Sequence, residues 1–150
     1  MEIVINKRYG GFGLSHEAIM EYARRKGFKL HPFTEKRDKE GDLIFVRKGK
    51  RLTNEIKFVP CGDQRPRPLM IHYSRRPPRK GGTYVESSYF WDHDIPRDDP
   101  VLCKLVKEWG ERANGDHASL RVVKVPDGVD WEIDEYNGME SVSEKHRTWS

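Results

Sequence analysis

The segment that most constrains the fold of this chain is Tyr9–Ser15, with the sequence YGGFGLS, which lies between an apolar run and a predicted helix. The apolar run is Ile3–Asn6, and a β-branched run bounded by glycines predicts a buried strand. Ser15 suits the N-cap of a helix over residues 16–26, and Gly27 stands where a C′ glycine belongs. The sequence therefore predicts a strand, a glycine-rich loop and a helix start in succession.

A glycine-rich loop before a helix favours an anion, because its N–H groups converge and the helix N-terminus carries partial positive charge. The segment has neither the Gly-Lys-Ser/Thr of a P-loop nor the G-x-G-x-x-G spacing of a dinucleotide-binding loop. Two interpretations remain open. The loop binds a phosphate or nucleotide, or it is a tight turn whose aromatic side chain packs on the core. In the first case the ligand-binding residues are Tyr9, Gly10, Gly11, Phe12, Gly13 and Ser15.

The composition predicts one folded domain over residues 1–150, with a basic segment at about 28–82. Charged residues make up 35% of the chain, yet an aromatic content of 11% argues against disorder. No apolar run approaches the ~20 residues of a membrane span, so no membrane partner is expected. Two distant cysteines and scattered histidines, none in a metal-ligand spacing, predict no metal site, and no cofactor is expected. The cysteines fit a reduced, cytoplasmic setting.

The formal net charge of +4 is distributed unevenly along the chain. Residues 24–80 contain 18 Lys or Arg and 6 Asp or Glu, a balance of +12. Residues 81–150 contain 8 Lys or Arg and 15 Asp or Glu, a balance of −7. Residues 1–23 contain 2 Lys or Arg and 3 Asp or Glu, a balance of −1. The middle segment either attracts a polyanion or is a solvated, loop-rich insertion whose charges pair with the acidic part.

The pattern of strands and helices predicts an α+β fold, with a mostly antiparallel sheet and two main helices, at about 16–26 and 100–114. Asp99 and Pro100 are typical of a helix start, and Asn137-Gly138 is a strong hairpin signal. Homo-oligomerisation would cover the exposed sheet edges. The expected strands are residues 3–6, 28–33, 42–47, 55–59, 69–73, 83–91, 120–125, 131–136 and 139–145, with a short helix as the alternative for the last. Pro32 would place its strand at a sheet edge or end it early, and Lys48-Gly49-Lys50 is typical of a hairpin turn.

Several of these motifs, in this order, resemble a widespread family of small proteins encoded mainly by tailed bacteriophages and some large DNA viruses. The resemblance covers roughly residues 2–27 and 89–149, and it implies that the basic middle, at about 28–82, is the family's variable part. It implies a viral origin and a small intracellular accessory protein, and it implies no particular activity. The motifs that carry it are IVIN (3–6), YGGFGLS (9–15), IPRDDP (95–100), ANG (113–115), VDWEIDEY (129–136) and EKHRTW (144–149).

The segment near residue 149 combines charged and aromatic side chains. Arg147 and His146 can bind a phosphate, and Trp149 either packs on the core or stacks on a ligand. Arg97 could also bind a phosphate, although Asp94 or Asp98 is the more expected partner for it.

An enzyme is not favoured, and no catalytic residue is assigned. Glu132 and Asp134 would share one face of a strand and could, with His146, form a hydrolase site. The polar face of an exposed strand has the same pattern, and no activated Ser or Cys motif is present.

The sequence thus favours a protein that binds a phosphorylated, nucleotide-like small molecule without turnover. For a viral protein, sequestering a host defence signal is a plausible purpose. The alternative is a nucleic-acid-binding protein acting through residues 24–80, with Arg75, Arg76, Arg79 and Lys80 as candidate contacts. A protein-directed inhibitor of a host factor is a third hypothesis.

Overall fold

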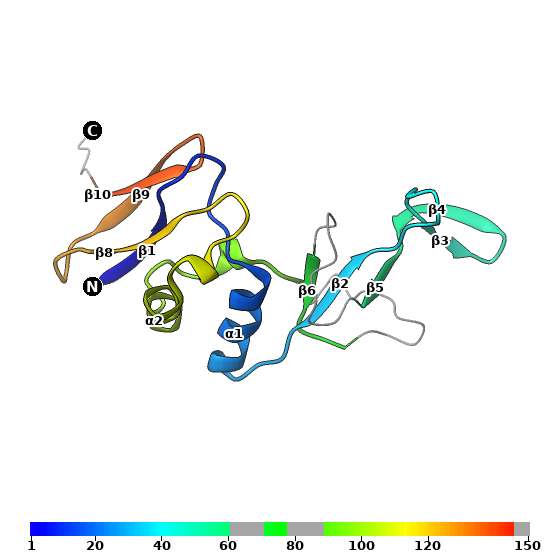
Figure 1. The fold of residues 1–150 in the computed structure, drawn as a ribbon, viewed down its shortest axis with the longest axis horizontal. Helices are drawn as coiled ribbons and strands as arrows, with labels where there is room; N and C mark the ends of the chain where they lie inside the picture. Colours follow the sequence, from blue (N-terminus) through cyan, green and yellow to red (C-terminus); the bar gives the residue numbers. More distant parts are fainter. Residues whose placement is uncertain (61–70, 78–88, 146–150) are drawn as a thin grey trace, which may run out of the picture. The chain divides into compact units, whose positions relative to one another are not determined.

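The computed structural model describes residues 1–60, 71–77 and 89–145, which form two compact units. Unit 1 comprises Met1–Lys26 and Asp92–Ser150, and unit 2 is the continuous segment Gly27–Trp91 inserted between them (Figure 1). Unit 2 contains most of the basic segment that the sequence singles out. The expectation of one domain over residues 1–150 stays a prediction.

The strands of unit 1 form two antiparallel pairs (Figure 1). Strand β1 (Glu2–Asn6) pairs with β8 (Leu120–Lys124), and β9 (Trp131–Tyr136) pairs with β10 (Met139–Glu144). The β9–β10 turn has positive φ at both central residues, 49° at Asn137 and 88° at Gly138. These values suit a type I′ turn, and the predicted hairpin is confirmed.

Helix α1 (His16–Lys26) begins and ends at the predicted residues. The Ser15 hydroxyl accepts the N–H of Ala18 at 3.2 Å, so Ser15 is the N-cap. Gly27 has a φ of 85°, the left-handed conformation that ends many helices.

Helix α2 (Pro100–Trp109) is capped by the Asp99 carboxylate, which accepts the N–H groups of Val101 and Leu102. Gly110 has a φ of 56° and ends the α-helix, so the last turn of the predicted 100–114 helix is the 3₁₀ segment η3 (Gly110–Ala113). A short 3₁₀ segment, η2 (Asp92–Asp94), precedes α2. Among the described residues, no helix is long and apolar enough to cross a membrane.

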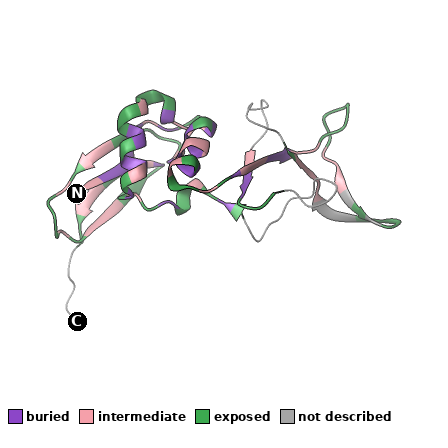
Figure 2. Cartoon of the chain, turned by 90° about the horizontal axis from the view of Figure 1, so that it is seen from below, coloured by how far each residue is buried: buried purple, intermediate pink, exposed green. Residues whose placement is uncertain are grey.

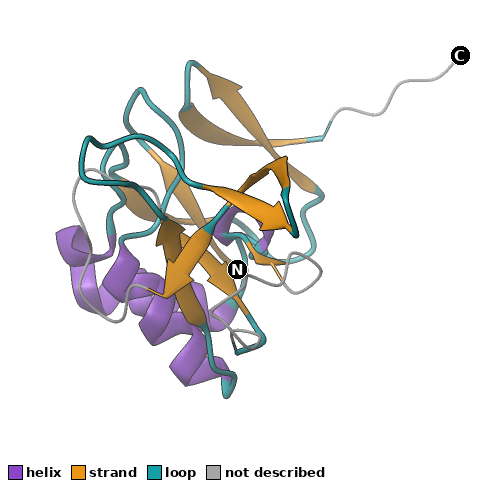
Figure 3. Ribbon diagram, turned by 90° about the vertical axis from the view of Figure 1, so that its right-hand side faces the viewer, coloured by secondary structure: helices purple, strands orange, loops and turns teal. Residues whose placement is uncertain are grey.

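The core of unit 1 lies between β1 and the two helices. Ile3 and Val4 of β1 and Leu102 and Leu105 of α2 have no exposed surface, and α1 packs against α2 (Figures 2 and 3). Burying an aliphatic side chain of this size contributes about 1.5–3 kcal/mol. The apolar face of α2 that carries Leu102 and Leu105 is therefore the face that holds the unit together.

Unit 2 consists of antiparallel strands in two sheets, so the whole described chain has the predicted α+β architecture. The four-stranded sheet has the order β5 (Phe58–Pro60), β2 (His31–Glu35), β6 (Ile71–Ser74) and β7 (Tyr89–Phe90). Strands β3 (Phe45–Lys48) and β4 (Arg51–Ile56) form a separate hairpin. The rest of the strand predicted at 83–91 lies outside the described residues.

Strand β2 corrects one prediction. Pro32 was expected to put its strand, at residues 28–33, on a sheet edge or to end it early, but β2 is central, begins three residues later and continues to Glu35. Pro32 lies opposite Tyr73 of β6, and the described pairing of β2 with β5 runs from Phe33 to Glu35.

Candidate functional site

The Tyr9–Ser15 loop lies close to two other turns of unit 1. A Cβ at Gly10 would lie 2.8 Å from the Cβ of His117, and a Cβ at Gly138 would lie 2.3 Å from the backbone N of Gly11. A Cβ at Gly115 would lie 2.9 Å from the carbonyl oxygen of Gly13. Packing against the β9–β10 turn and the turn before β8 therefore explains the glycine at position 10, and the φ of 107° explains the one at position 11. No such contact accounts for Gly13, since its added Cβ would have only the Asp92 carboxylate, at 3.9 Å, among the described atoms within 4 Å.

Several N–H groups of this loop already have acceptors within the protein. Gly10 donates to the Asn137 carbonyl at 3.1 Å, and Ser15 donates to the Ala113 carbonyl at 2.9 Å. Leu14 donates to the Asp92 carboxylate at 2.9 Å, which places a negative charge beside the start of α1. These bonds weigh against a phosphate at the loop, because an incoming anion would compete with acceptors already in place and with a carboxylate.

Phe12 is a core residue, 6% exposed. The Arg97 guanidinium lies 3.6 Å from the centre of its ring, and the His93 imidazole meets the ring edge at 5.6 Å. His93 Nδ1 is 2.9 Å from the Asp92 carboxylate. The position of Phe12 therefore agrees with the interpretation of the loop as a tight turn whose aromatic side chain packs on the core. The fold also brings Phe12 and Arg97 together, as a ligand site formed by both would require.

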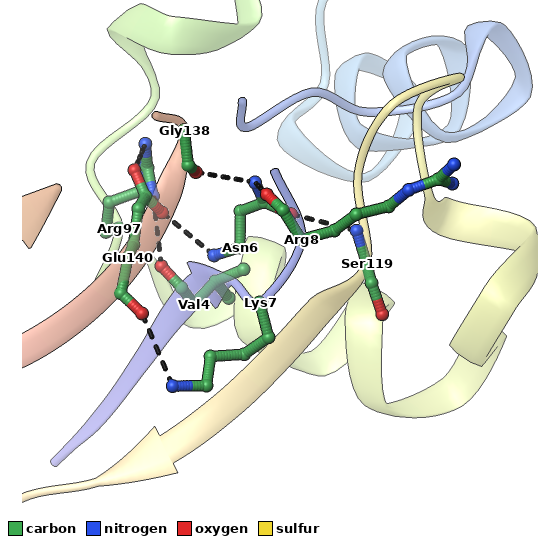
Figure 4. Close-up of polar contacts among 8 residues, drawn as sticks. All are labelled: Val4, Asn6, Lys7, Arg8, Arg97, Ser119, Gly138 and Glu140. Carbon is green, nitrogen blue, oxygen red and sulfur yellow. Dashed lines mark hydrogen bonds and ion pairs between the residues drawn. The ribbon is translucent and has the colours of Figure 1, made fainter. Parts of the chain in front are cut away.

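Arg97 does not pair with Asp94 or Asp98, as the sequence suggested, but with Glu140 of β10. Its two terminal nitrogens meet the two carboxylate oxygens at 2.6 and 3.0 Å, a bidentate geometry (Figure 4). The side chains are only 15% and 6% exposed. Arg97 thus pairs with a carboxylate that the fold brings opposite it, and not with the aspartates that are its neighbours in the sequence.

Asn6 extends this ion pair into a network of buried polar groups. Its backbone N–H donates to Glu140 at 2.8 Å, and its amide donates to the carbonyls of Arg8 and Gly138, both at 2.7 Å (Figure 4). The Asn6 side-chain oxygen accepts the N–H of Ser119 at 2.8 Å. The charged groups of Arg97 and Glu140 thus have their partners within the protein. A phosphate could bind Arg97 only by breaking its contacts with Glu140.

His146, Arg147 and Trp149 lie outside the described residues, so their part of the predicted site stays a prediction. The strand that leads to them runs away from the glycine-rich loop. Strand β10 starts beside that loop at Met139 and ends at Glu144. The next residue, Lys145, donates its backbone N–H to the Asp130 carbonyl at 2.8 Å. Six strand residues span about 20 Å.

The carboxylates considered for catalysis lie on β9, where Asp134 accepts a hydrogen bond from Ser143 of β10 at 2.6 Å. In the part of the chain that the structure describes, no group of three or more His, Cys, Asp or Glu side chains could hold a metal ion.

Fewer of the described cations have a carboxylate partner in unit 2 than in unit 1, although Lys7, Arg8, Arg112, Arg121 and Lys124 of unit 1 also have none among the described side chains. Unit 1 pairs cations such as Arg25, Lys26 and Lys107 with carboxylates. Among the described side chains of unit 2, only Arg37 has such a partner, Glu35 at 3.1 Å. The described cations without one are Lys29, Lys36, Lys39, Arg47, Lys50, Arg51, Lys57, Arg75 and Arg76.

The β3–β4 hairpin concentrates these cations at its tip. Lys48 pairs with Arg51 across a turn at Gly49, whose φ is 64°. Arg47, Lys50 and Arg51 are exposed. The sequence predicted the turn but not the gathering of exposed cations around it. The available signal was four cations among the five residues 47–51 with no carboxylate between them.

Arg75 and Arg76, predicted as nucleic-acid contacts, are both exposed at the end of β6. The Arg75 guanidinium lies 4.2 Å from the centre of the Phe28 ring. Arg79 and Lys80 lie outside the described residues.

Comparison of the chain with protein-family models, with curated proteins and with solved structures finds no match. Its function is therefore inferred from its own residues.

Proposed function

We propose that this protein binds nucleic acid through the basic surface of unit 2. The observation that carries the proposal is the set of exposed cations in that unit that have no carboxylate partner among the described side chains. Phosphates would supply the missing counter-charges. Unit 2 contains 15 Lys or Arg and 7 Asp or Glu, a balance of +8. Unit 1 contains 13 and 17, a balance of −4, so the positive field belongs to unit 2.

The shape of the hairpin supports the same proposal. A two-stranded ribbon is narrow enough to enter a groove or to lie along a phosphate backbone. Arg47, Lys50 and Arg51 are exposed near its tip. At its base, the backbone N–H of Ile44 donates to the Lys36 carbonyl at 3.0 Å and that of Lys57 donates to the Ile44 carbonyl at 2.8 Å, which joins the hairpin to the four-stranded sheet. The hairpin is thus a supported extension rather than an isolated ribbon.

The test is a titration of the protein with labelled DNA and RNA at several salt concentrations. Replacing Arg47, Lys50 and Arg51 by Ser should weaken binding and reduce the slope of log K against log salt. The expected reduction is about 0.9 for each lost duplex phosphate contact, or about 0.7 for a single strand. The matched control replaces Lys104, Arg121 and Lys124, three exposed cations of unit 1, by Ser. The control has the same charge change and should leave the slope unaltered.

Absence of any DNA or RNA binding at low salt would overturn the proposal. An equal loss in the control variant would show that total charge matters rather than the surface of unit 2.

The small-molecule hypothesis makes a different prediction, namely heat on titration with free nucleotides that is unaffected by changes in unit 2. The hydrogen bonds of Gly10, Leu14 and Ser15 within the protein weigh against it. For the viral accessory protein that the sequence resembles, the polyanions within reach are the genomes and transcripts of the infected cell. Homo-oligomerisation and a host protein partner stay predictions.

A further inference from the structure

The tip of the β3–β4 hairpin carries an exposed leucine among its cations. Leu52 is 56% exposed, and it is the only exposed side chain among the leucines and isoleucines that the structure describes. Arg47, Lys50 and Arg51, which lie at the same tip, are exposed as well. Removing apolar surface from water is favourable, so a ligand that covered Leu52 would gain affinity in addition to what the cations supply.

The strand register places Leu52 beside Arg47. The two residues lie opposite each other, so their side chains share one face of the ribbon. Arg51 lies opposite Lys48 and belongs to the other face. The turn residue Lys50 is two positions from Leu52, which corresponds to about 7 Å along a strand. The apolar side chain therefore lies just behind the tip, between cations on both faces of the ribbon.

The hairpin is anchored at the end opposite its tip. Phe45 pairs with Ile56 and the next pair is Arg47 with Leu52, so β3 advances by two residues while β4 advances by four. A bulge of this kind bends a ribbon and increases its twist. On the other side of the bulge, the backbone hydrogen bonds of Ile44 join the hairpin to the four-stranded sheet, beyond which it extends (Figure 1). The tip is thus a short projection supported by the sheet, as insertion into a groove requires.

We infer that the β3–β4 hairpin enters the minor groove of duplex DNA, where Leu52 inserts between two base pairs and bends the duplex. The inference rests on the proposed function and narrows its ligand. An apolar side chain inserted from the minor groove partly unstacks a base step and kinks the duplex by about 20–90° toward the major groove. Arg47, Lys50 and Arg51 bind the phosphates that border the groove, and their charge offsets part of the cost of unstacking.

The dimensions of the ribbon favour this groove. The minor groove of B-form DNA is about 7.5 Å deep, close to the distance between Leu52 and the end of the hairpin. It is about 6 Å wide, so two strands about 4.8 Å apart enter with their side chains only if the groove opens, as it does in a kinked duplex. Double-stranded RNA has a shallow minor groove and a major groove too narrow for side chains, and a single strand has no groove. Duplex DNA is therefore the ligand that the ribbon fits.

The test measures bending, as resonance energy transfer between dyes at the two ends of a short A·T-rich duplex saturated with protein. Wild type should increase the transfer. Leu52→Ala should lose this increase, whereas Leu52→Met, which keeps a long apolar side chain, should retain it. Neither variant should alter the salt slope of binding, because no phosphate contact is lost. The matched control is Tyr136→Ala, which removes a 71% exposed side chain from unit 1 and should bend DNA like wild type. Netropsin, a small molecule that occupies the minor groove, should displace the wild-type protein.

The outcomes separate this inference from the proposed function. Binding of duplex DNA without bending, equal bending by Leu52→Ala and wild type, or binding that netropsin leaves undiminished would overturn the inference while leaving nucleic-acid binding intact. Tighter binding of RNA or of single-stranded DNA than of the duplex would overturn it in the same way. Failure to bind any nucleic acid would overturn both. Circular dichroism of each variant checks that the exposed substitution leaves the fold unchanged, and the netropsin experiment needs no variant.

Discussion

Arg97 and Glu140 form a bidentate ion pair between the segment before α2 and strand β10, with contacts of 2.6 and 3.0 Å. Glu140 also accepts the backbone N–H of Asn6, so one carboxylate connects three separate segments of unit 1. The pair is shielded from water on one side by Phe12, on whose ring the guanidinium lies. Unit 1 is thus held at its centre by charge as well as by its apolar core.

Removing one member of this pair should therefore be costly. We expect Glu140→Ala to lower the free energy of unfolding by about 3–5 kcal/mol, because it leaves a largely buried guanidinium without its partner. Urea denaturation measures the change. Lys107→Ala, which breaks the exposed pair with Glu2, should cost about 1 kcal/mol or less. Similar losses in the two variants would contradict the central role of Arg97 and Glu140.

The backbone contact at Gly138 gives a second prediction. Gly138→Ala should destabilise unit 1 through both its φ of 88° and the collision with Gly11. Gly128→Ala is the matched control, since Gly128 has a φ of 81° but nothing within 4 Å of the added Cβ. We expect about 1–2 kcal/mol for the control and a further ~1–3 kcal/mol for Gly138→Ala in thermal or urea unfolding. Equal losses would show that the two backbones can move apart.

Asp99 predicts a pH dependence of stability. Burial acts to raise the pKa of its carboxyl, but hydrogen bonds from Tyr22, from the backbone of Leu102 and Val101 and from Lys26 outweigh it, and the pKa is lowered. A folded-state pKa below the unfolded value stabilises the fold above the unfolded pKa of about 3.9, and this stabilisation disappears as pH falls through the folded pKa.

We therefore expect wild type to be more stable than Asp99→Asn at pH 7, by about 1.5–3 kcal/mol for hydrogen bonds to a charged group. The difference should shrink below pH 4. Urea unfolding at pH 7, 5 and 3 measures it, with Glu111→Gln as an exposed control. A difference that persists undiminished at pH 3 would assign the effect to packing rather than to charge.

Cys103 should be unreactive in the folded protein. Burial raises the pKa of its thiol to about 11, with further contributions from the carboxylates of Glu2 and Asp99. About one thiol in a thousand is then ionised at pH 8, and the thiolate is the reactive form. Alkylation followed by peptide mapping should label Cys103 in denaturant and leave it unlabelled in native protein. Rapid labelling under native conditions would show that α2 opens readily.

The sequence was sufficient where the information is local. Ser15, Asp99 and the Asn137-Gly138 turn each act on residues one to four positions away, and all three predictions were confirmed. The helices follow from the same local signals, as does the turn at Gly49.

The sequence was insufficient where the partner is remote. The glycine-rich loop suggested a ligand because nothing local reveals that Gly10 faces His117 or that Gly138 faces Gly11. Arg97 was expected to choose a neighbouring aspartate because Glu140, 43 residues away, comes opposite it only after β10 has paired. Pro32 suggested an edge because nothing near it in the sequence reveals that β5 and β6 pair with the two sides of β2.

The insertion of unit 2 into unit 1 fixes an order of events on the ribosome. Gly27–Trp91 is continuous, so all its strands have been synthesised before Asp92 emerges. Strand β1, in contrast, is made first but pairs with β8, from Glu2 with Lys124 to Asn6 with Leu120. The apolar residues of β1 can pair only after more than a hundred further residues have been synthesised. Contacts between residues so far apart in the sequence form slowly. During synthesis the nascent chain therefore exposes an unpaired Ile3-Val4-Ile5 strand until β8 has been made, and in this period a chaperone that covers apolar strands would protect it most.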